Sequence, residues 1–475
     1  MGRNRDAGVR RHIGKKPYGE YSYWLESCGD DLTPRPGLKG SLTVDVAIVG
    51  AGFSGLWTAY YLLQTNPSLR VVILEQAIAG FGASGRNGGW CTAEFSRSIT
   101  SLVKRYGTDA TRLLQQAMFD SVDEVGRVIQ VENIEAHFAK GGMIEVARGQ
   151  WGIPALETMI REFEMVGLEN RVQYLDRDQL SSRIQIAEAE AGVFAKDCAV
   201  LHPGRLVRQL ARVVENLGAT IMENTAVLEV IGGKFPRLIT GHGDVTTKVA
   251  VVMATEAYLT ALKPWHRAVV PVYSLITLTE PLSHEVWETI GWTNREAIAS
   301  TRMTIDYLQR THDGRILFGG RGAPYHWNSS LRDEYDHHRA THKVLQEMVK
   351  QWFPVLKDTR FTHVWGGALG VTRDFMPNIR FDLRTRIATA FGYTGQGVAT
   401  SNLAGRILNE LISETPGNLT HLPMAQHHSR LWEPEPLRWA GIRYTQWALG
   451  RIDQQSQRLQ KSPSGSSLAE RLNVH

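Results

Sequence analysis

Two apolar runs near the start of the chain flank one amphipathic segment. Residues 45–49 (DVAIV) and 71–74 (VVIL) are almost wholly apolar, and each run has the length of a buried strand. Between them, Gly50, Gly52 and Gly55 precede a segment with helical spacing. The order strand, glycine turn, helix, strand, closed by an acidic residue, predicts a Rossmann-like unit that binds a dinucleotide.

Each residue type in this motif has a physical role. Gly50 allows a tight turn, Gly52 lets the backbone approach a pyrophosphate, and Gly55 lets the helix pack on the strand. The pyrophosphate is expected at the N-terminus of the helix, where free N–H groups and the helix dipole favour an anion. The acidic residue, Glu75, is expected to accept hydrogen bonds from ribose hydroxyls. It argues against a 2′-phosphate but leaves FAD and NAD open.

The rest of the chain alternates between helical and strand-like stretches. Apolar residues at helical spacing predict long helices over residues 97–165. Residues 201–230 predict a turn, a helix and a strand, and residues 269–320 are β-rich, as in an antiparallel sheet. Near the end, a buried strand at 387–391 leads through glycines into a helix at 398–412. The pattern therefore predicts a nucleotide-binding part and a second, antiparallel part.

Composition narrows the class of protein. At 475 residues the chain is long enough for two connected domains, and 43% hydrophobic with 21% charged residues is ordinary for a globular protein. The net charge of +5 is not gathered into a long basic run outside the termini, so it does not argue for nucleic acid. The three cysteines form no metal-binding pattern, which predicts reduced thiols, a cytoplasmic protein and no metal site.

One segment near the C-terminus has a composition that suits contact with a membrane surface. No apolar run approaches the roughly 20 residues that a membrane-spanning helix needs. Residues 437–451 combine Leu437, Tyr444 and Trp447 with arginines in a partly amphipathic helix. We expect this helix to dock on the body of the protein, with peripheral contact to a membrane surface as the alternative. Residues beyond 455 are polar and serine-rich, which predicts disorder.

A glycine-rich loop follows the second strand directly. Residues 77–95 (AIAGFGASGRNGGWCTAEF) place Ser84, Arg86 and Asn87 among five glycines. A plain NAD-binding fold needs no such loop here, whereas flavoproteins use one to line the pyrophosphate and the flavin edge; a structural surface loop is the alternative. The glycines at 392–397 offer a second helix N-terminus, and the sequence has no second strand–glycine–helix unit for NADPH.

Three blocks together resemble the D-amino-acid-oxidase-type family of FAD-dependent oxidoreductases. They are the first glycine motif, the stretch GASGRNGG, and the C-terminal WGG…GYTGQGVATS. GASGRNGG and WEPEPLRWAGIR look most like the gamma-glutamylputrescine oxidase branch of that family, and the resemblance covers residues 20–450. It implies an α/β fold with a discontinuous, Rossmann-like FAD-binding domain and an α+β substrate domain on an antiparallel sheet. The expected segments are an N-terminal arm (1–40), the FAD-binding domain (41–100, 190–260 and 360–415), the substrate domain (101–189 and 261–359) and a C-terminal extension (416–475).

The same resemblance assigns residues to the cofactor. The first glycine motif would hold the pyrophosphate, Glu75 and Gln76 the ribose, Val227 the adenine, and the two glycine loops the diphosphate and flavin. The full expected set is Gly50, Ala51, Gly52, Phe53, Ser54, Gly55, Glu75, Gln76, Ser84, Gly85, Arg86, Asn87, Gly88, Gly89, Val227, Thr255, Gly395, Gln396, Gly397, Val398 and Ala399. FAD is expected to be non-covalent, because the loop has no histidine and no cysteine follows Cys198.

The resemblance also implies a reaction, the oxidation of a C–N bond. A hydride passes from the carbon beside a neutral amine to the flavin, the imine hydrolyses, and oxygen reoxidises the flavin to give hydrogen peroxide. Expected substrates are gamma-glutamylputrescine-like amines, N-alkyl amino acids or D-amino acids. Trp90, Trp365 and Tyr393 are candidate pocket walls, with core packing as the alternative. Arg321 is a candidate clamp for a substrate carboxylate, with an exposed strand-end charge as the alternative.

Two other functions stay open at this point. Some relatives place a lysine over the flavin to activate oxygen, but the matching strand here ends in Gly319-Gly320-Arg321, which argues against rapid use of oxygen. An FAD amine dehydrogenase that passes electrons to a quinone or carrier is therefore one alternative. A non-catalytic flavin-binding partner protein is another.

Overall fold

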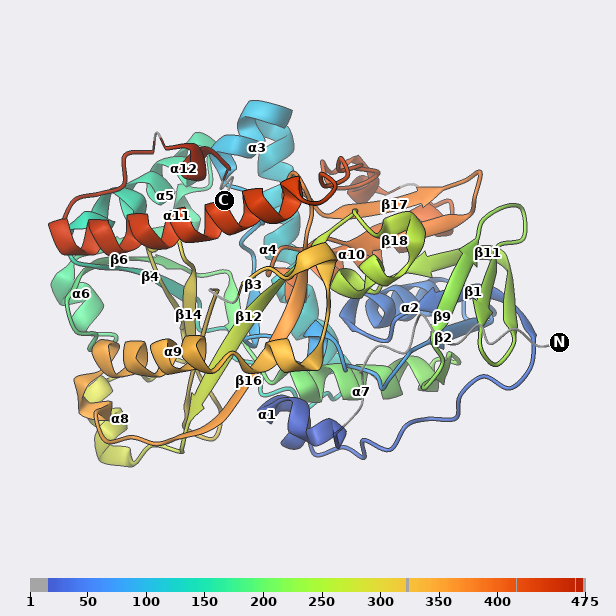
Figure 1. The fold of residues 1–475 in the computed structure, drawn as a ribbon, viewed down its shortest axis with the longest axis horizontal. Helices are drawn as coiled ribbons and strands as arrows, with labels where there is room; N and C mark the ends of the chain where they lie inside the picture. Colours follow the sequence, from blue (N-terminus) through green and yellow to red (C-terminus); the bar gives the residue numbers. More distant parts are fainter. Residues whose placement is uncertain (1–15, 322–323, 416, 466, 473–475) are drawn as a thin grey trace.

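Two lobes, each built around one β-sheet, lie side by side along the long axis of the molecule (Figure 1). The computed structural model describes residues 16–321, 324–415, 417–465 and 467–472, with Arg321 described by its backbone alone. Most of the predicted N-terminal arm is among them, whereas its first 15 residues lie outside the described part of the chain.

The first sheet has the predicted Rossmann-like core. Its strands follow the order β17-β18-β11-β1-β2-β8, and β10 and β9 extend it beside β11. The central strands are parallel, and β1 is buried on both faces, which explains its uninterrupted apolar run. The strands are β1 (Leu42–Val49), β2 (Val71–Leu74), β8 (Thr220–Met222), β9 (Val227–Ile231), β10 (Arg237–Thr240), β11 (Asp244–Met253), β17 (Asn378–Asp382) and β18 (Ile387–Phe391). They come from three separate stretches of the chain, so the prediction of a discontinuous domain is confirmed.

The second sheet is mainly antiparallel. Its order is β16-β12-β15-β14-β13-β4-β6-β5, and the single parallel pair joins β13 to β4. The strands are β4 (Met143–Arg148), β5 (Val172–Leu175), β6 (Ala189–Ala195), β12 (Val270–Thr279), β13 (Ala297–Ser300), β14 (Asp306–Arg310), β15 (Ile316–Arg321) and β16 (Phe361–Val371). A separate two-stranded sheet is formed by β3 (Trp90–Thr92) and β7 (Cys198–Val200). Along the chain, each of these strands lies between a strand of the first sheet and a strand of the second.

Helices cover both sheets. They are α1 (Tyr23–Glu26), α2 (Phe53–Thr65), α3 (Ile99–Tyr106), α4 (Thr108–Val131), α5 (Ile153–Met165), α6 (Arg177–Ser181), α7 (Pro203–Asn216), α8 (His284–Ile290), α9 (Arg339–Trp352), α10 (Gly397–Ile412), α11 (Leu437–Leu459) and α12 (Leu468–Leu472). In Figure 1, α2 and α10 lie with the first sheet, whereas α8 and α9 lie with the second. The layered arrangement is that of an α/β domain joined to an α+β domain.

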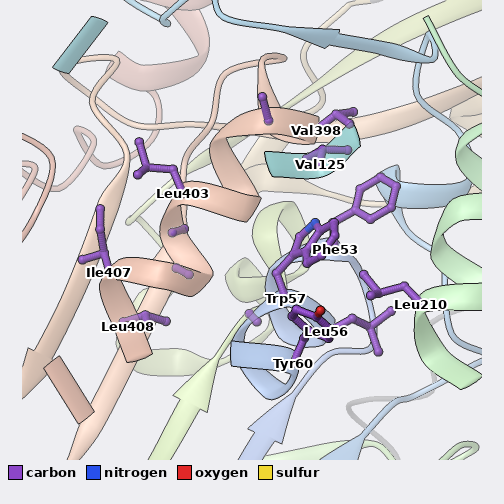
Figure 2. Packing of buried hydrophobic residues seen from close by; sticks show 14 of the residues in the cluster. Phe53, Leu56, Trp57, Tyr60, Val125, Leu210, Val398, Leu403, Ile407 and Leu408 are labelled. Carbon is purple, nitrogen blue, oxygen red and sulfur yellow. The ribbon is translucent and has the colours of Figure 1, made fainter. Parts of the chain in front are cut away.

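The main core joins α2, α4, α7 and α10 to the first sheet. Figure 2 shows α10, which carries Leu403 and Ile407, next to α2, which carries Leu56 and Trp57, and all four side chains are fully buried. The two helices approach so closely because α10 carries Gly405 at the contact. A methyl group there would lie 2.8 Å from the carbonyl carbon of Trp57.

Three of the expected domain limits differ from the sheets observed. β16 and β6, which we assigned to the FAD-binding domain, are strands of the second sheet. The long helix α4, which we assigned to the substrate domain, packs through Met118 and Val122 into the core of the first. These limits could not be found from periodicity, because a strand or helix has the same pattern whichever sheet it joins.

The C-terminal extension is more ordered than expected. We expected disorder after residue 455, but α11 continues to Leu459, and α12 follows it. Asp453 and Ser456 are buried, which ties this end of α11 to the body of the protein. Across the described residues, no helix is both long enough and apolar enough to cross a bilayer.

The close contact of α2 with α10 generates a stability prediction. Gly405→Ala must push the backbone of Trp57 away, so we expect the free energy of unfolding to fall by about 1–3 kcal/mol or more. The melting temperature of the purified apoprotein measures this.

Gly450→Ala is the matched control, because a methyl group at Gly450 on α11 would meet nothing within 4 Å. It should leave the melting temperature unchanged or raise it, since alanine favours a helix by about 1 kcal/mol over glycine. Equal melting temperatures for the two variants would contradict the proposed contact.

Candidate active site

A cavity of about 840 Å³ lies between the two sheets. One end is lined by the carboxyl ends of β1, β2 and β11, at Val49, Leu74 and Ala254. The other end is lined by residues of the second sheet, among them Glu145 and Tyr307. Ligands of open parallel sheets bind at the carboxyl ends of the strands, so the position of the cavity agrees with the predicted nucleotide site.

The turn after β1 has the predicted close contacts. Gly50 has a φ of +104°, and a methyl group on it would lie 2.6 Å from the carbonyl oxygen of Ala254. A methyl group on Gly55 would collide with the carbonyl oxygen of Gly50. At the start of α2, the N–H of Phe53 donates to the hydroxyl of Ser84 at 2.9 Å, so the glycine loop caps this helix.

Glu75 stands at the end of β2, as predicted, and faces the cavity. Its two carboxylate oxygens accept hydrogen bonds from the N–H groups of Ala51 and Ala77, each at 2.9 Å. Burial raises the pKa of Glu75 to about 6, although these N–H groups favour the ionised form. Each oxygen keeps a further acceptor position, so the carboxylate can still accept from a ribose hydroxyl.

The glycine loop is held in shape by the N-terminal arm. The hydroxyl of Ser22 donates to the carbonyl of Gly85 at 2.6 Å, and the indole N–H of Trp24 donates to the carbonyl of Asn87 at 2.8 Å. Within the loop, the Asn87 amide bonds the carbonyls of residues 83 and 84 and the N–H of Gly89. The arm and the Asn87 side chain therefore fix the backbone that lines the cavity.

Arg86 faces the cavity but also braces the two lobes. Its guanidinium forms a buried ion pair with Asp336 at 2.5 Å and donates to the carbonyl of Phe81. It lies over the rings of Phe81 and Tyr21, at 4.2 and 4.8 Å from their centroids. One nitrogen, Nη2, is buried without a hydrogen-bond partner among the described residues. That nitrogen is free to donate to an acceptor placed in the cavity.

Trp365 is not a wall of the cavity, which corrects the prediction. Its indole N–H donates to the backbone carbonyl of Arg86 at 3.0 Å, and its ring meets Trp24 edge-on at 6.2 Å. The ring is 1% exposed and packs behind the glycine loop. Trp24, from the N-terminal arm, takes the space beside it, and the sequence gives no sign of that contact.

Of the other three candidates for the substrate pocket, two line the cavity and the third has a side chain outside the described part of the structure. Trp90 lines the cavity, donates its indole N–H to the carbonyl of Leu308 at 3.1 Å and meets the ring of Tyr307 edge-on at 5.8 Å. Tyr393 also lines it, and its hydroxyl shares a hydrogen bond of 2.8 Å with Ser54 at the start of α2. Arg321 ends β15, but its side chain lies outside the described part of the structure.

Most of the predicted cofactor residues meet around the cavity. Those that line it are Gly50, Gly52, Phe53, Ser54, Glu75, Gln76, Ser84, Arg86, Asn87, Gly88, Val227, Thr255, Gly395, Gln396, Gly397 and Val398. Ala51, Gly55, Gly85, Gly89 and Ala399 lie just behind this lining and shape its backbone. Their contacts with the cofactor stay predictions. The hydroxyl of Thr255 is buried without a partner among the described residues, as a hydroxyl meant for a ligand would be.

Glu256, which the sequence analysis missed, connects two of the glycine segments. Its carboxylate accepts the N–H of Gly370 at 2.9 Å and the N–H of Gly392 at 2.7 Å. Its own backbone has a φ of +47°, an uncommon conformation for glutamate. Burial raises its pKa to about 7. The sequence did offer one sign of this role, because Glu256 is an acidic residue that closely follows the end of the buried strand β11.

The far end of the cavity is acidic, which was not predicted from the sequence. Four carboxylates line it: Glu94, Glu145, Glu162 and Asp306. Burial raises the pKa of Glu145 to about 8, and repulsion from the other three carboxylates adds to the shift. Burial also raises the pKa of Glu94 to about 7. A glutamate within the apolar strand sequence GGMIEVA was the available signal for Glu145.

Glu145 is the centre of this acidic group. Among the described residues it has no hydrogen-bond or ion-pair partner, whereas Glu94 accepts from Gln396 at 3.3 Å and Glu162 from the N–H of Thr100 at 3.0 Å. Asp306 accepts the N–H and hydroxyl of Ser300 with one oxygen, and its other oxygen is unpartnered among the described residues. The far end of the cavity therefore has spare capacity to bind a cation.

The fold and the cavity define a two-domain protein with a dinucleotide site facing an acidic chamber. Comparison with known proteins identifies the family: the model of the "FAD dependent oxidoreductase" (DAO) family matches residues 45–411. The chain therefore belongs to this family, as the sequence motifs predicted. It is an FAD-dependent oxidoreductase, and its glycine-lined cavity suits that cofactor.

Individual relatives agree with this assignment. The chain is 30% identical over 411 residues to the gamma-glutamylputrescine oxidoreductase of Escherichia coli, covering 85% of this chain and 92% of the relative. It is 29% identical to a probable oxidoreductase, OrdL, of Haemophilus influenzae, covering 82% and 88%. The crystal structure of glycine oxidase from Geobacillus kaustophilus superposes with a TM-score of 0.66 at 20% identity, covering 81% of this chain and 99% of that one.

The unpartnered Glu145 generates a prediction about pH and stability. Its pKa is raised from 4.5 in the unfolded chain to about 8, so the folded state binds the proton more tightly. Its contribution to stability is therefore present at low pH and is lost as the pH rises through about 8. We expect the Glu145→Gln apoprotein to lie close to the wild type near pH 5 and to exceed it by up to about 4 kcal/mol near pH 8.

Thermal melting of both proteins across this pH range measures the difference. Glu157→Gln on α5, which removes a carboxylate that is 53% exposed, is the control and should follow the wild type at every pH. A Glu145→Gln curve parallel to that of the wild type would show that Glu145 is ionised in both states.

Proposed function

We propose that this enzyme oxidises the C–N bond of an amine that carries a positive charge. The observation that carries the proposal is the acidic group of Glu94, Glu145, Glu162 and Asp306 at the end of the cavity opposite the dinucleotide site. An ammonium group bound there would pair with carboxylates that otherwise repel one another.

The arginines that line the cavity are paired with protein groups, and this pairing favours a cationic substrate over an amino acid. An amino-acid carboxylate is best bound by two nitrogens of a free arginine, and each of the four arginines among the described residues that line the cavity already has a partner, although Arg86 keeps Nη2 unpartnered. Their partners are Asp336 for Arg86, the carbonyl of residue 374 for Arg97, Asp197 for Arg171 and Asp453 for Arg302. The relative in Escherichia coli is named for gamma-glutamylputrescine, an amine that also carries a glutamyl carboxylate, so its name does not separate these two substrate classes.

The chain's residues would act mainly by binding, orienting and excluding water. FAD, when bound non-covalently, supplies the hydride acceptor. The substrate C–H bond breaks, the nitrogen loses its proton, and the resulting imine is hydrolysed by water. An aliphatic amine of pKa near 10 must be presented neutral, which costs roughly 4 kcal/mol at neutral pH. Trp90 and Tyr307 provide an apolar wall that lowers this cost, because a dry surface disfavours the ammonium form.

The final electron acceptor is proposed to be oxygen, with hydrogen peroxide as the product. A dehydrogenase that uses a quinone or carrier is the second candidate, and one observation favours it. No lysine is among the described residues that line the cavity, and the strand that carries lysine in some relatives has Gly319 and Gly320 here. The buried, unpaired cysteines support a reducing compartment such as the cytoplasm.

Reduction of the bound flavin by amines tests the proposal. We expect the flavin absorption of the purified holoenzyme to bleach anaerobically with diamines and polyamines, and more weakly with N-methyl amino acids or D-amino acids. Glu145→Gln should raise the amine concentration for half-maximal bleaching about tenfold, because one charge pairing is lost. Glu157→Gln is the control.

Three outcomes would contradict parts of this proposal. Bleaching by amino acids alone would show that the acidic chamber does not select the substrate. A yellow protein that no amine reduces would support a non-catalytic flavin-binding protein. If amines bleach the flavin rapidly but no oxygen is consumed, and an added quinone restores the flavin absorption, the enzyme is a dehydrogenase and not an oxidase.

A further inference from the structure

The outward face of α11 is unusually rich in exposed aromatic residues. Trp439 and Trp447 on α11 are 39% and 58% exposed, and Trp327, whose ring lies 6.3 Å from that of Trp439, is 54% exposed. These are the three exposed tryptophans among the described residues, and Tyr444 lies between the two on the helix. We call this group the α11 face: Trp327, Trp439, Arg443, Tyr444, Trp447 and Arg451.

The charges on the α11 face are all positive. Arg443 lies over the ring of Trp439 at 6.0 Å, and Arg451 lies over the ring of Trp447 at 5.2 Å. Successive tryptophans and arginines at 439, 443, 447 and 451 are four residues apart, so they share one side of the helix. The only carboxylate on α11 is Asp453, which is 1% exposed and faces inward.

The inward face of α11 is fixed to the protein, so the outward face is not exposed through fraying. Asp453 accepts the N–H groups of Met303 and Thr304 at 3.0 and 2.8 Å. At the other end, the carboxylate of Glu435 accepts from the hydroxyl of Tyr325 and the N–H of Asn328, both at 3.0 Å. A helix held on both ends presents its aromatic side in one orientation.

The composition of this face matches an anionic bilayer surface. Tryptophan and tyrosine prefer the membrane–water interface, where the ring is partly buried and the polar edge stays hydrated. Arginines attract anionic lipid headgroups, each by a term that falls off within a Debye length. A large exposed aromatic group without carboxylates is costly on a protein that remains in water.

We propose that the α11 face docks the protein on the surface of an anionic phospholipid bilayer, with the helix lying in the interfacial plane. Arg302 and Ile305, which line the cavity, flank the two residues that Asp453 holds. Docking therefore places one rim of the cavity directly behind α11, one helix diameter (~10 Å) from the lipid surface. The proposal does not depend on which amine is oxidised.

Vesicle sedimentation of the full-length holoenzyme tests the docking. We expect binding to vesicles of phosphatidylcholine mixed with phosphatidylglycerol, weak binding to phosphatidylcholine alone, and loss of binding in high salt. Arg443→Gln with Arg451→Gln should weaken binding by roughly tenfold or more, since each arginine contributes about one charge pairing at the surface. Trp439→Ser with Trp447→Ser should weaken binding to a similar extent.

The control replaces exposed aromatic residues on other surfaces, Tyr174→Ser with Phe235→Ser, whose rings are 40% and 57% exposed. This variant should bind vesicles like the wild type, and flavin content should be the same in all variants. Equal binding of every variant, or equal binding to neutral and anionic vesicles, would overturn the proposal. So would concentration-dependent self-association that the tryptophan variant abolishes without any vesicle binding, because the face would then join two copies of the chain.

Discussion

The backbone of α10 rests directly on the backbone of α2, and the cavity depends on that contact. Gly405 permits it, because any side chain there would strike the main chain of Trp57. The contact brings the N-termini of both helices to the cavity, where Ser54 at the start of α2 bonds Tyr393 just before α10. Two helix N-termini then favour the same anionic ligand. Residues that are 339 positions apart in sequence thus form one binding surface.

The sequence predicted the features that arise locally. The strands β1 and β2, the turn at Gly50 and the helix α10 follow from apolar runs, glycines and helical spacing, and all are present. Contacts that join distant segments were not predictable in this way. Trp365 was misplaced because Trp24 of the arm packs against it, and Arg86 was read as a cofactor contact although it also pairs with Asp336. The family resemblance supplied the positions of Val227 and Thr255, which no pattern in their own segments marks.

The acidic chamber is costly for the folded protein. Carboxylates that face one another in a partly dry cavity repel, and Glu145 has no compensating partner among the described residues. Stabilising replacements are easy to find in most proteins, so a cost of this kind persists where it serves binding or catalysis. Glu256 differs, because two backbone N–H groups satisfy its carboxylate and its purpose is to position glycine segments.

The segment that holds the rim of the cavity lies beyond the residues that the family model covers. The match ends at residue 411, whereas Asp453 of α11 fixes Met303 and Thr304 next to the cavity-lining Arg302. A change in this terminal helix therefore need not disturb the cofactor-binding sheet. A substitution at Asp453 can in this way alter the rim of the cavity, and with it the entry of a substrate, from outside the cofactor-binding sheet.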